Sequence, residues 1–259
     1  MSQVQNFLNS YFKYLDIKKG DHLLIHSDLR NLFRILFKEK IKLTPDEMID
    51  FFVNLVGPNG SVSFPTFNFD FCNIGLYSFN NTISKMGILS EAARKNKYGN
   101  KTWNPVYSFK IFGNVPKKII ERKNYNSLGK DTFFDWLNIN KGKIIIINLP
   151  DQKSMTIYHH FEELKLVDWR YHKKFKGIYI DKNEKKTDLE ISIFVRKIDN
   201  NIVTDVSGME KLLWKKKLYK SINSSNIDPR IINIQSIQKE VFNIIDKKKG
   251  EGTLYRVLK

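Results

Sequence analysis

The chain has 259 residues, of which 41% are hydrophobic, and its longest apolar run falls well short of the roughly 18 to 20 residues that span a bilayer, so we expect no membrane span. The single cysteine, Cys72, excludes an intrachain disulfide and a thiolate zinc cluster, and we expect no metal. The formal net charge of +17 would favour anionic ligands, but the lysines are spread along the chain without zinc-finger spacing, an RNP-type strand or a basic arm, so we expect no nucleic-acid partner.

The first part of the chain predicts a helix, a strand and a second helix. Residues 1–15 place apolar side chains at helical spacing and lack the basic-then-apolar order of a signal peptide, so we expect an amphipathic helix and a cytoplasmic protein. After a Gly-Asp turn, the apolar run at 22–29 predicts a buried strand that leads into a loop. Thr44 and Pro45, followed by two acids, predict a helix that stops at the turn GPNG (57–60).

The middle of the chain predicts alternating strands and helices. Pro65 marks the end of strand pairing in SVSFPTF (61–67). We then expect a helix at SKMGILSEAARKN (84–96), a loop and a strand at TWNPVYSFKIFG (102–113), short helices at VPKKIIERKN (115–124) and DTFFDWLN (131–138), a strand at KGKIIIINL (141–149), and a helix from Ser154 or Met155. Strands separated by helices predict an α/β fold in which helices flank a central mixed sheet with crossover connections.

The pattern changes toward the C-terminus. From about residue 176, alternating charged segments predict an antiparallel hairpin that turns at KNEK (182–185), followed by a helix from about Gly208 and then mixed signals. We expect one domain spanning 1–259, with its core at about 15–177 and a smaller C-terminal hairpin and helical portion at about 178–259. Ligands of such sheets bind beyond the carboxyl ends of strands, where the loops HSDLR, PTFNFD and PDQKSMT are expected.

Three of the five histidines lie within residues 154–175. On a helix, residues three or four apart share a face, so His159 aligns with Glu162 and Glu163, whereas His160 points about 100° away. A neutral imidazole accepts a proton well near pH 7, and a carboxylate on its other ring nitrogen fixes the tautomer and raises its basicity. The pattern therefore fits a base with an orienting acid.

Other interpretations of this pattern remain open. A solvated surface helix would show the same spacing of histidine and glutamate. His159 and Glu163 also have the spacing of two metal ligands, but HExxH is absent and no third ligand is evident. There is no GxSxG elbow, and Cys72 has no neighbouring histidine in sequence, so neither a serine nor a cysteine nucleophile is indicated.

Six blocks together resemble a known family. GDHLLIHSDLR, GPNGSVSFPTFNFDF, SKMGILSEAARKN, NPVYSFKIFG, SLGKDTFFDWL and MTIYHHFEELKLVDWRYHKKFKG occur in the order, and at about the spacing, of the aminoglycoside 3-N-acetyltransferases, from about residue 15 to 177. The resemblance implies a fold distinct from the GNAT fold. It also implies an enzyme that transfers an acyl group from coenzyme A to an amino group on a sugar or related small molecule.

The resemblance also assigns roles to residues. His159, in the T-x-x-H-x-x-E block that begins at Thr156, corresponds to the histidine that activates the acceptor amine, and Glu162 becomes its orienting partner. Backbone N–H groups at the start of the S-K-x-G helix suit a phosphate or a thioester oxyanion. The residues expected to contact coenzyme A are His26, Ser27, Leu29, Arg30, Thr66, Lys85, Met86, Gly87 and Ser108.

The acceptor side departs from the family pattern. Members that act on aminoglycosides typically carry R-S-x-H-P-x-H-S, whereas KTWNPVYS places Asn104 and Tyr107 at the histidine positions. In the H-S-S-L-R loop, Asp28 replaces the second serine. Arg170 is a candidate for holding an acceptor phosphate, or for pairing with Glu163. The full set of acceptor candidates is Asp70, Asn104, Tyr107, Glu163 and Arg170.

Three functions compete. The leading one is coenzyme A-dependent N-acylation of an amino sugar, carried on a nucleotide, in surface-glycan biosynthesis, because relatives with N-P-x-Y-S are associated with glycan amino sugars and a positive protein attracts an anionic acceptor. The second is aminoglycoside resistance, which the altered block and the charge disfavour. The third is a noncatalytic binder of nucleic acid or phospholipid, against which His159 and Glu162 count.

We expect direct transfer in a ternary complex without an acyl-enzyme, because Cys72 is the one residue that would support the alternative. The sequence does not indicate which acyl group is transferred, which amino sugar accepts it, or the oligomeric state, for which a homodimer is one option.

Overall fold

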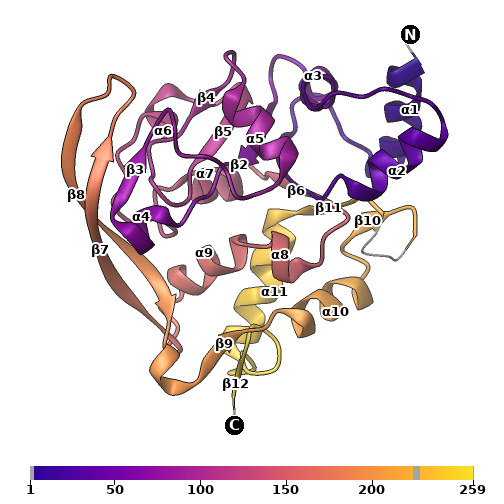
Figure 1. Cartoon of the computed structure of the whole chain (residues 1–259). Coiled ribbons are helices and arrows are strands. Elements are labelled where there is room, and N and C mark those ends of the chain that lie inside the picture. The colour runs from indigo at the N-terminus through magenta and orange to yellow at the C-terminus, as the bar shows by residue number, and fades with distance from the viewer. Residues whose placement is uncertain (1–2, 224–227, 259) are drawn as a thin grey trace.

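The computed structural model describes residues 3–223 and 228–258, which form a mixed α/β fold (Figure 1). The helices are α1 (Gln3–Phe12), α2 (Arg30–Lys38), α3 (Pro45–Val56), α4 (Asp70–Ile74), α5 (Ile88–Lys95), α6 (Lys117–Ile120), α7 (Phe133–Ile139), α8 (Asp151–Ser154), α9 (Ile157–Leu164), α10 (Ser207–Lys215) and α11 (Ile234–Asp246), with 3-10 turns η1 (Lys13–Leu15) and η2 (Ile198–Asn200). The strands are β1 (His22–Ser27), β2 (Ser61–Pro65), β3 (Leu76–Ser78), β4 (Asn100–Lys101), β5 (Phe109–Gly113), β6 (Lys143–Ile147), β7 (Arg170–Ile180), β8 (Lys186–Arg196), β9 (Ile202–Thr204), β10 (Lys220–Ser221), β11 (Arg230–Asn233) and β12 (Tyr255–Val257).

The main sheet has seven strands in the order β10-β11-β6-β1-β2-β5-β4. Its centre, β6-β1-β2, is parallel, so these three strands end at the same edge. The strands outside this centre run antiparallel to their neighbours. The chain leaves β1 for β2 on one side and later enters β6 on the other, which makes the end of β1 a switch point of the kind where ligands bind. The predicted mixed sheet flanked by helices is confirmed.

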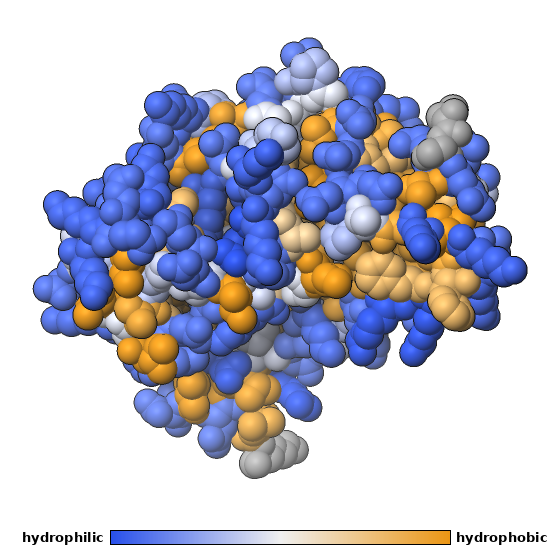
Figure 2. All heavy atoms as spheres, turned by 45° about the horizontal axis from the view of Figure 1, so that its top comes forward, coloured by the Kyte–Doolittle hydropathy of each residue, from blue (hydrophilic) through white to orange (hydrophobic). Residues whose placement is uncertain are grey.

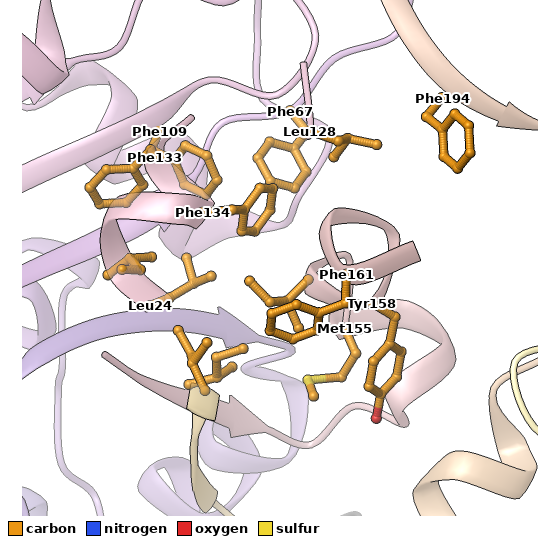
Figure 3. Close-up of a cluster of buried hydrophobic side chains, with 14 of the residues drawn as sticks. Leu24, Phe67, Phe109, Leu128, Phe133, Phe134, Met155, Tyr158, Phe161 and Phe194 are labelled. Atoms are coloured by element: carbon orange, nitrogen blue, oxygen red, sulfur yellow. The ribbon is translucent and has the colours of Figure 1, made fainter. Parts of the chain in front are cut away.

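Both faces of this sheet are buried. Along β1, Leu23 and Ile25 join a core with α1, α2, α3 and α5, whereas Leu24 joins the core on the opposite face with α7, α9 and α11, as strand alternation requires. Figure 3 shows the second core, in which Tyr158 and Phe161 of α9 pack beneath the sheet. Both side chains are almost fully buried, so α9 is fixed against the sheet by its apolar face.

Local sequence signals explain why helix α3 was predicted. Thr44 and Glu47 form a capping box at the start of α3, in which the Thr44 hydroxyl accepts from the Glu47 N–H and the Glu47 carboxylate accepts from the Thr44 N–H. Pro45 occupies the first helical position, where its missing N–H costs nothing. The helix ends at Val56, and Gly57, the first residue of the predicted GPNG turn, caps it.

Several boundaries differ from prediction. The loop after β1 is only two residues long, because α2 begins at Arg30. The histidine helix α9 begins at Ile157 and is preceded by the separate turn α8. The hairpin turns within the predicted KNEK segment, but β7 already begins at Arg170, because it pairs with β8 through its charged residues at 172–176. Charged side chains on both faces hid this strand from the alternation pattern.

The C-terminal part is not set apart from the main sheet. Strand β11 pairs with β6 in register Ile231 to Ile145, and α11 packs against α9. The expected boundary near residue 177, between the core and the C-terminal portion, therefore does not coincide with an edge of the main sheet. The segment RIIN is too short an apolar run to be identified as a strand from sequence, and its pairing with β6 is a long-range contact.

Candidate active site

Glu162 on α9 is held by three neighbours. Its Oε2 lies 2.8 Å from Nδ1 of His159 and 2.8 Å from Nε of Arg170. Its Oε1 accepts a hydrogen bond of 2.8 Å from Nε1 of Trp169. Burial opposes the negative charge of this carboxylate, but Arg170, His159 and Trp169 outweigh burial and hold the pKa of Glu162 below its usual range. Glu162 is therefore a buried, ionised partner for the histidine.

The ring of His159 is 22% exposed and lies against both Glu162 and Arg170. Burial, and then the charge of Arg170, lower the pKa of His159, and the contact with Glu162 offsets only part of this. The predicted contact between His159 and Glu162 is present. Because the ring is neutral at pH 7, one of its nitrogens can accept a proton.

Arg170 is buried and reaches three elements at once. Its Nη2 lies 2.7 Å from Nδ1 of His159 and 3.3 Å from the hydroxyl of Thr204, and its Nη1 donates to the carbonyl of Phe194 at 3.0 Å. The expected alternative of an Arg170–Glu163 pair is wrong, because β7 begins at Arg170 and directs the guanidinium at Glu162. The role of Arg170 in holding an acceptor phosphate stays a prediction.

Glu163 pairs with residues other than His159 despite its helical spacing. Its Oε1 accepts from the side-chain amide of Asn126 at 2.5 Å and lies 3.9 Å from Nε2 of His172, whereas its Oε2 is buried without a hydrogen-bond partner. Burial raises the pKa of Glu163, and burial also raises the pKa of Tyr107 to about 12. The Tyr107 ring packs edge-on against the rings of Phe67 and Phe69, with ring centres 5.2 Å and 5.8 Å away.

A cavity of about 590 Å³ opens at the carboxyl end of β1. It is lined by His26, Ser27, Asp28, Leu29, Arg30, Phe33, Lys85, Met86, Gly87, Ile88, Leu149 and Lys153. The structure thus brings together seven of the nine residues predicted to contact coenzyme A. Thr66 and Ser108 do not line it, because both are buried and their hydroxyl oxygens are 2.8 Å apart.

The lining of this cavity suits a phosphorylated ligand. The first turns of α2 and α5 border it, and their N–H groups have no intrahelical partner, but the first N–H of α2, that of Arg30, donates to the Asp28 carboxylate at 3.0 Å. Nε2 of His26 is buried without a partner, and burial lowers the pKa of His26 to about 3, so this ring is neutral. Gly87 opens α5 with φ +96°, and a Cβ there would lie 3.2 Å from the Ser27 carbonyl oxygen, which explains the glycine.

Two acceptor candidates are engaged elsewhere. The Asp70 carboxylate pairs with Nζ of Lys85 at 2.5 Å. The Asn104 side chain accepts from the N–H groups of Val106 and Tyr107 and donates to the hydroxyl of Ser127, so it fixes the NPVYS loop. Sequence reasoning missed Trp169 and Thr204. The signal for Trp169 was its place directly before Arg170 within the histidine block, but nothing in the sequence indicated that β9 would reach Arg170.

No helix within residues 3–223 and 228–258 is long and apolar enough to cross a membrane. In the same residues, the side chains of His, Cys, Asp and Glu form no group of three or more that could hold a metal ion.

Comparison with known proteins identifies the family. The family model of aminoglycoside 3-N-acetyltransferase matches residues 24–245. The fold is similar to that of AAC-IIIb in binary complex with CoASH (TM-score 0.77, 15% identity, 94% of this chain and 96% of that chain covered) and to that of the YokD protein from Bacillus subtilis (TM-score 0.72, 14% identity, 93% and 98% covered). It is also similar to that of AAC-VIa bound to sisomicin (TM-score 0.75, 12% identity, 94% and 97% covered), whereas no curated protein matches the chain. The chain belongs to the aminoglycoside 3-N-acetyltransferase family.

Proposed function

We propose that the chain is an acyl-CoA-dependent N-acyltransferase that acts on the amino group of an amino sugar, with His159 as the general base. The observation that carries the proposal is the pair formed by His159 and the buried Glu162, 2.8 Å apart on α9. The family assignment and the CoASH in the AAC-IIIb structure support an acetyl or short acyl donor. Acyl-CoA is an intracellular metabolite, so we expect the reaction in the cytoplasm.

The cavity at the end of β1 fits the donor. The N–H groups at the start of α5 suit the pyrophosphate, and Lys153 adds a positive charge. The unpartnered Nε2 of His26 offers a hydrogen bond to the polar pantetheine chain. The donor supplies the thioester, and the protein supplies its orientation.

The chemistry follows from the contacts of His159. Its Nδ1 lies between an obligate acceptor, Glu162, and an obligate donor, Arg170, so only one of the two can be its hydrogen-bond partner. With the proton on Nδ1 directed at Glu162, Nε2 keeps its lone pair and takes the proton that the acceptor amine loses as its nitrogen bonds to the thioester carbonyl carbon. The C–S bond then breaks, and coenzyme A leaves as the thiol with the proton that Nε2 returns. General-base help of this kind is worth about 10² to 10⁴ in rate.

Direct transfer is favoured over an acyl-enzyme. Burial raises the pKa of the Cys72 thiol to about 11. At pH 7 the thiolate fraction is then on the order of 10⁻⁴, and the thiolate is the nucleophilic form. The amine of the acceptor therefore attacks the thioester within a ternary complex.

We propose that the acceptor is an amino sugar carried on a nucleotide, used in surface-glycan biosynthesis. Asn104 and Tyr107 replace family histidines on the acceptor side, and the net charge of +17 suits an anionic acceptor. The buried, unpartnered Oε2 of Glu163 would accept a hydrogen bond from a sugar hydroxyl or amine. Thiol release from acetyl-CoA with nucleotide-linked amino sugars and aminoglycosides tests this, and turnover of aminoglycosides alone would contradict it.

Aminoglycoside acetylation is the second candidate, because the family is named for it and AAC-VIa was solved with sisomicin. Drug susceptibility of a strain that expresses the chain separates the two. If the acceptor is a nucleotide-linked sugar, the inhibitory concentrations of aminoglycosides will match those of a strain that expresses the His159→Ala variant.

A further inference from the structure

A further cavity has no role in the reaction above. It has a volume of about 660 Å³, within the range of small-molecule sites. It lies between the β7–β8 hairpin, α6 and the β4 region, which adjoin in Figure 1. Its lining comprises Phe79, Lys101, Trp103, Ile120, Glu121, Lys123, Tyr125, Tyr179, Asp181, Lys182, Lys185, Thr187, Asp188, Leu189 and Glu190.

The lysines and the carboxylates of this lining differ in how they are engaged. Glu190 lies 2.7 Å from Nζ of Lys174 and 3.4 Å from Nζ of Lys176, both outside the lining. Asp181 accepts two backbone N–H groups of the hairpin turn. The lining lysines are Lys101, Lys123, Lys182 and Lys185. Within residues 3–223 and 228–258, the Nζ atoms of these four lysines have no carboxylate oxygen within 4.0 Å. Of the remaining lining carboxylates, Glu121 lies 3.6 Å from Nζ of Lys117, whereas Asp188 has no cationic nitrogen within 4.0 Å in the described residues. The cavity therefore presents four ammonium groups and one unpaired carboxylate, so an anion can pair with the lysines.

Lys101 is the most enclosed of these lysines. Its Nζ donates to the carbonyl of Phe79 at 2.7 Å and lies 4.8 Å from the centre of the Phe79 ring and 5.1 Å from that of the Tyr77 ring. Burial lowers the pKa of Lys101 to about 7, with smaller contributions from Arg94 and Lys110. A bound anion would relieve this unfavourable burial of charge, because it would supply the missing opposite charge.

The other half of the lining is aromatic. Trp103 stacks on Tyr179, with ring centres 5.2 Å apart, and meets Tyr125 at an angle, with ring centres 5.3 Å apart. The Tyr125 side chain is half exposed, so one ring at the mouth is available to a ligand. Flat aromatic faces beside unpaired lysines are the combination that binds a base together with its phosphates.

We propose that this cavity binds the nucleoside diphosphate part of the acceptor. The proposal rests on the proposed function, in which the acceptor carries a nucleotide. Tyr125 directly precedes Asn126, whose amide donates to Glu163 on α9 at 2.5 Å. Glu163 is one helical turn from His159, so the Tyr125 side of the cavity is joined to the helix that carries the base.

The test is calorimetric titration of the protein with uridine diphosphate while coenzyme A is saturating, so that the nucleotide cannot enter the donor site. The double variant Lys182→Gln/Lys185→Gln is compared with Lys38→Gln/Lys40→Gln, which removes the same charge from exposed positions at the end of α2. We expect the cavity variant to bind at least about tenfold more weakly, since charge-assisted contacts to phosphate are lost, and the control to bind like wild type. A Trp103→Leu variant should lose the nucleotide-induced change in tryptophan fluorescence.

Equal binding by the cavity and control variants would overturn the assignment, as would wild-type protein that binds no uridine diphosphate. Neither result tests the proposed function, because acyl transfer is measured separately as thiol release that depends on His159. Amino-sugar turnover without nucleotide binding would leave an N-acyltransferase whose acceptor lacks a nucleotide.

Discussion

At the scale of single residues, one guanidinium organises the candidate base. Arg170 neutralises Glu162, touches His159 and is itself fixed by Thr204 and by the carbonyl of Phe194. The charged groups that act on His159 come from three elements: Glu162 of α9, Arg170 of β7 and Arg196 of β8. Because burial and the two positive charges together lower its pKa, His159 stays neutral to lower pH than a free histidine.

Removing the Arg170 charge should shift the pH profile of acyl transfer. A base works in its unprotonated form, so kcat/KM falls as the pH drops through the pKa of His159, which lies below its usual value. In Arg170→Met this pKa rises and the acid limb moves to higher pH, whereas Arg170→Lys keeps the charge and stays nearer wild type. An acid limb that does not move in Arg170→Met would show that Arg170 only supports the fold.

Loss of the only thiol should leave the reaction intact. Cys72→Ala is expected to retain kcat within about threefold, because the buried thiol is not an acyl carrier. Mass spectrometry of wild-type protein incubated with acetyl-CoA alone provides the control, and an acetyl adduct on Cys72 would refute direct transfer.

At the scale of elements, a buried ion pair fixes the segment that leads into α9. Asp151, at the start of α8, lies 2.9 Å from Nη2 of Arg230 in β11, and both side chains have 0% exposure. The hydroxyl groups of Tyr158 and Tyr219 also donate to Asp151. Strand β11 thereby anchors α8, the helical turn that precedes the histidine helix α9.

Breaking that pair should destabilise the whole fold. Arg230→Met leaves the Asp151 carboxylate buried without its cation, and we expect the free energy of unfolding to fall by about 3 to 5 kcal/mol. Urea denaturation measures it. The matched control is Arg256→Met, since Arg256 is 61% exposed and its Nε lies 3.6 Å from Asp205, and it should cost less than about 1 kcal/mol. Similar losses in the two variants would contradict the anchoring role.

The elements also show which features were predictable. Helical spacing predicted that His159 shares a face with Glu162 and Glu163, and the family resemblance selected Glu162 as its partner. The cavity at the end of β1 was predicted because parallel strands end at one edge. Arg170 was predicted to hold the acceptor or to pair with Glu163. Its partners in the structure were not predicted, because they depend on the early start of β7 and on the position of β9. Such contacts are long-range, and no local pattern encodes them.

At the scale of the molecule, the chain carries a formal net charge of +17. The face in Figure 2 is mostly hydrophilic, with apolar groups in scattered patches. With 44 lysines and arginines against 27 acids, the field should draw anionic ligands and repel polycations. This bears on the choice between a nucleotide-linked sugar and an aminoglycoside.

Salt should therefore act oppositely on the two acceptor classes. Raising ionic strength from about 0.05 M to about 0.5 M shortens the screening length severalfold, so KM for a nucleotide-linked amino sugar should rise and KM for an aminoglycoside should fall or stay constant. Steady-state kinetics with coenzyme A saturating at each salt concentration measures both. An anionic acceptor whose KM ignores salt would show that the net charge has no part in selecting it.

The central claim is that His159 is the base of an acyl transfer to an amino sugar. Its most direct test is thiol release from acetyl-CoA with a nucleotide-linked amino sugar, compared between wild type and His159→Ala. The account predicts that kcat falls by about 10² to 10⁴ in the variant while coenzyme A binding is unchanged. A variant that turns over the same acceptor within a fewfold of wild type would contradict it.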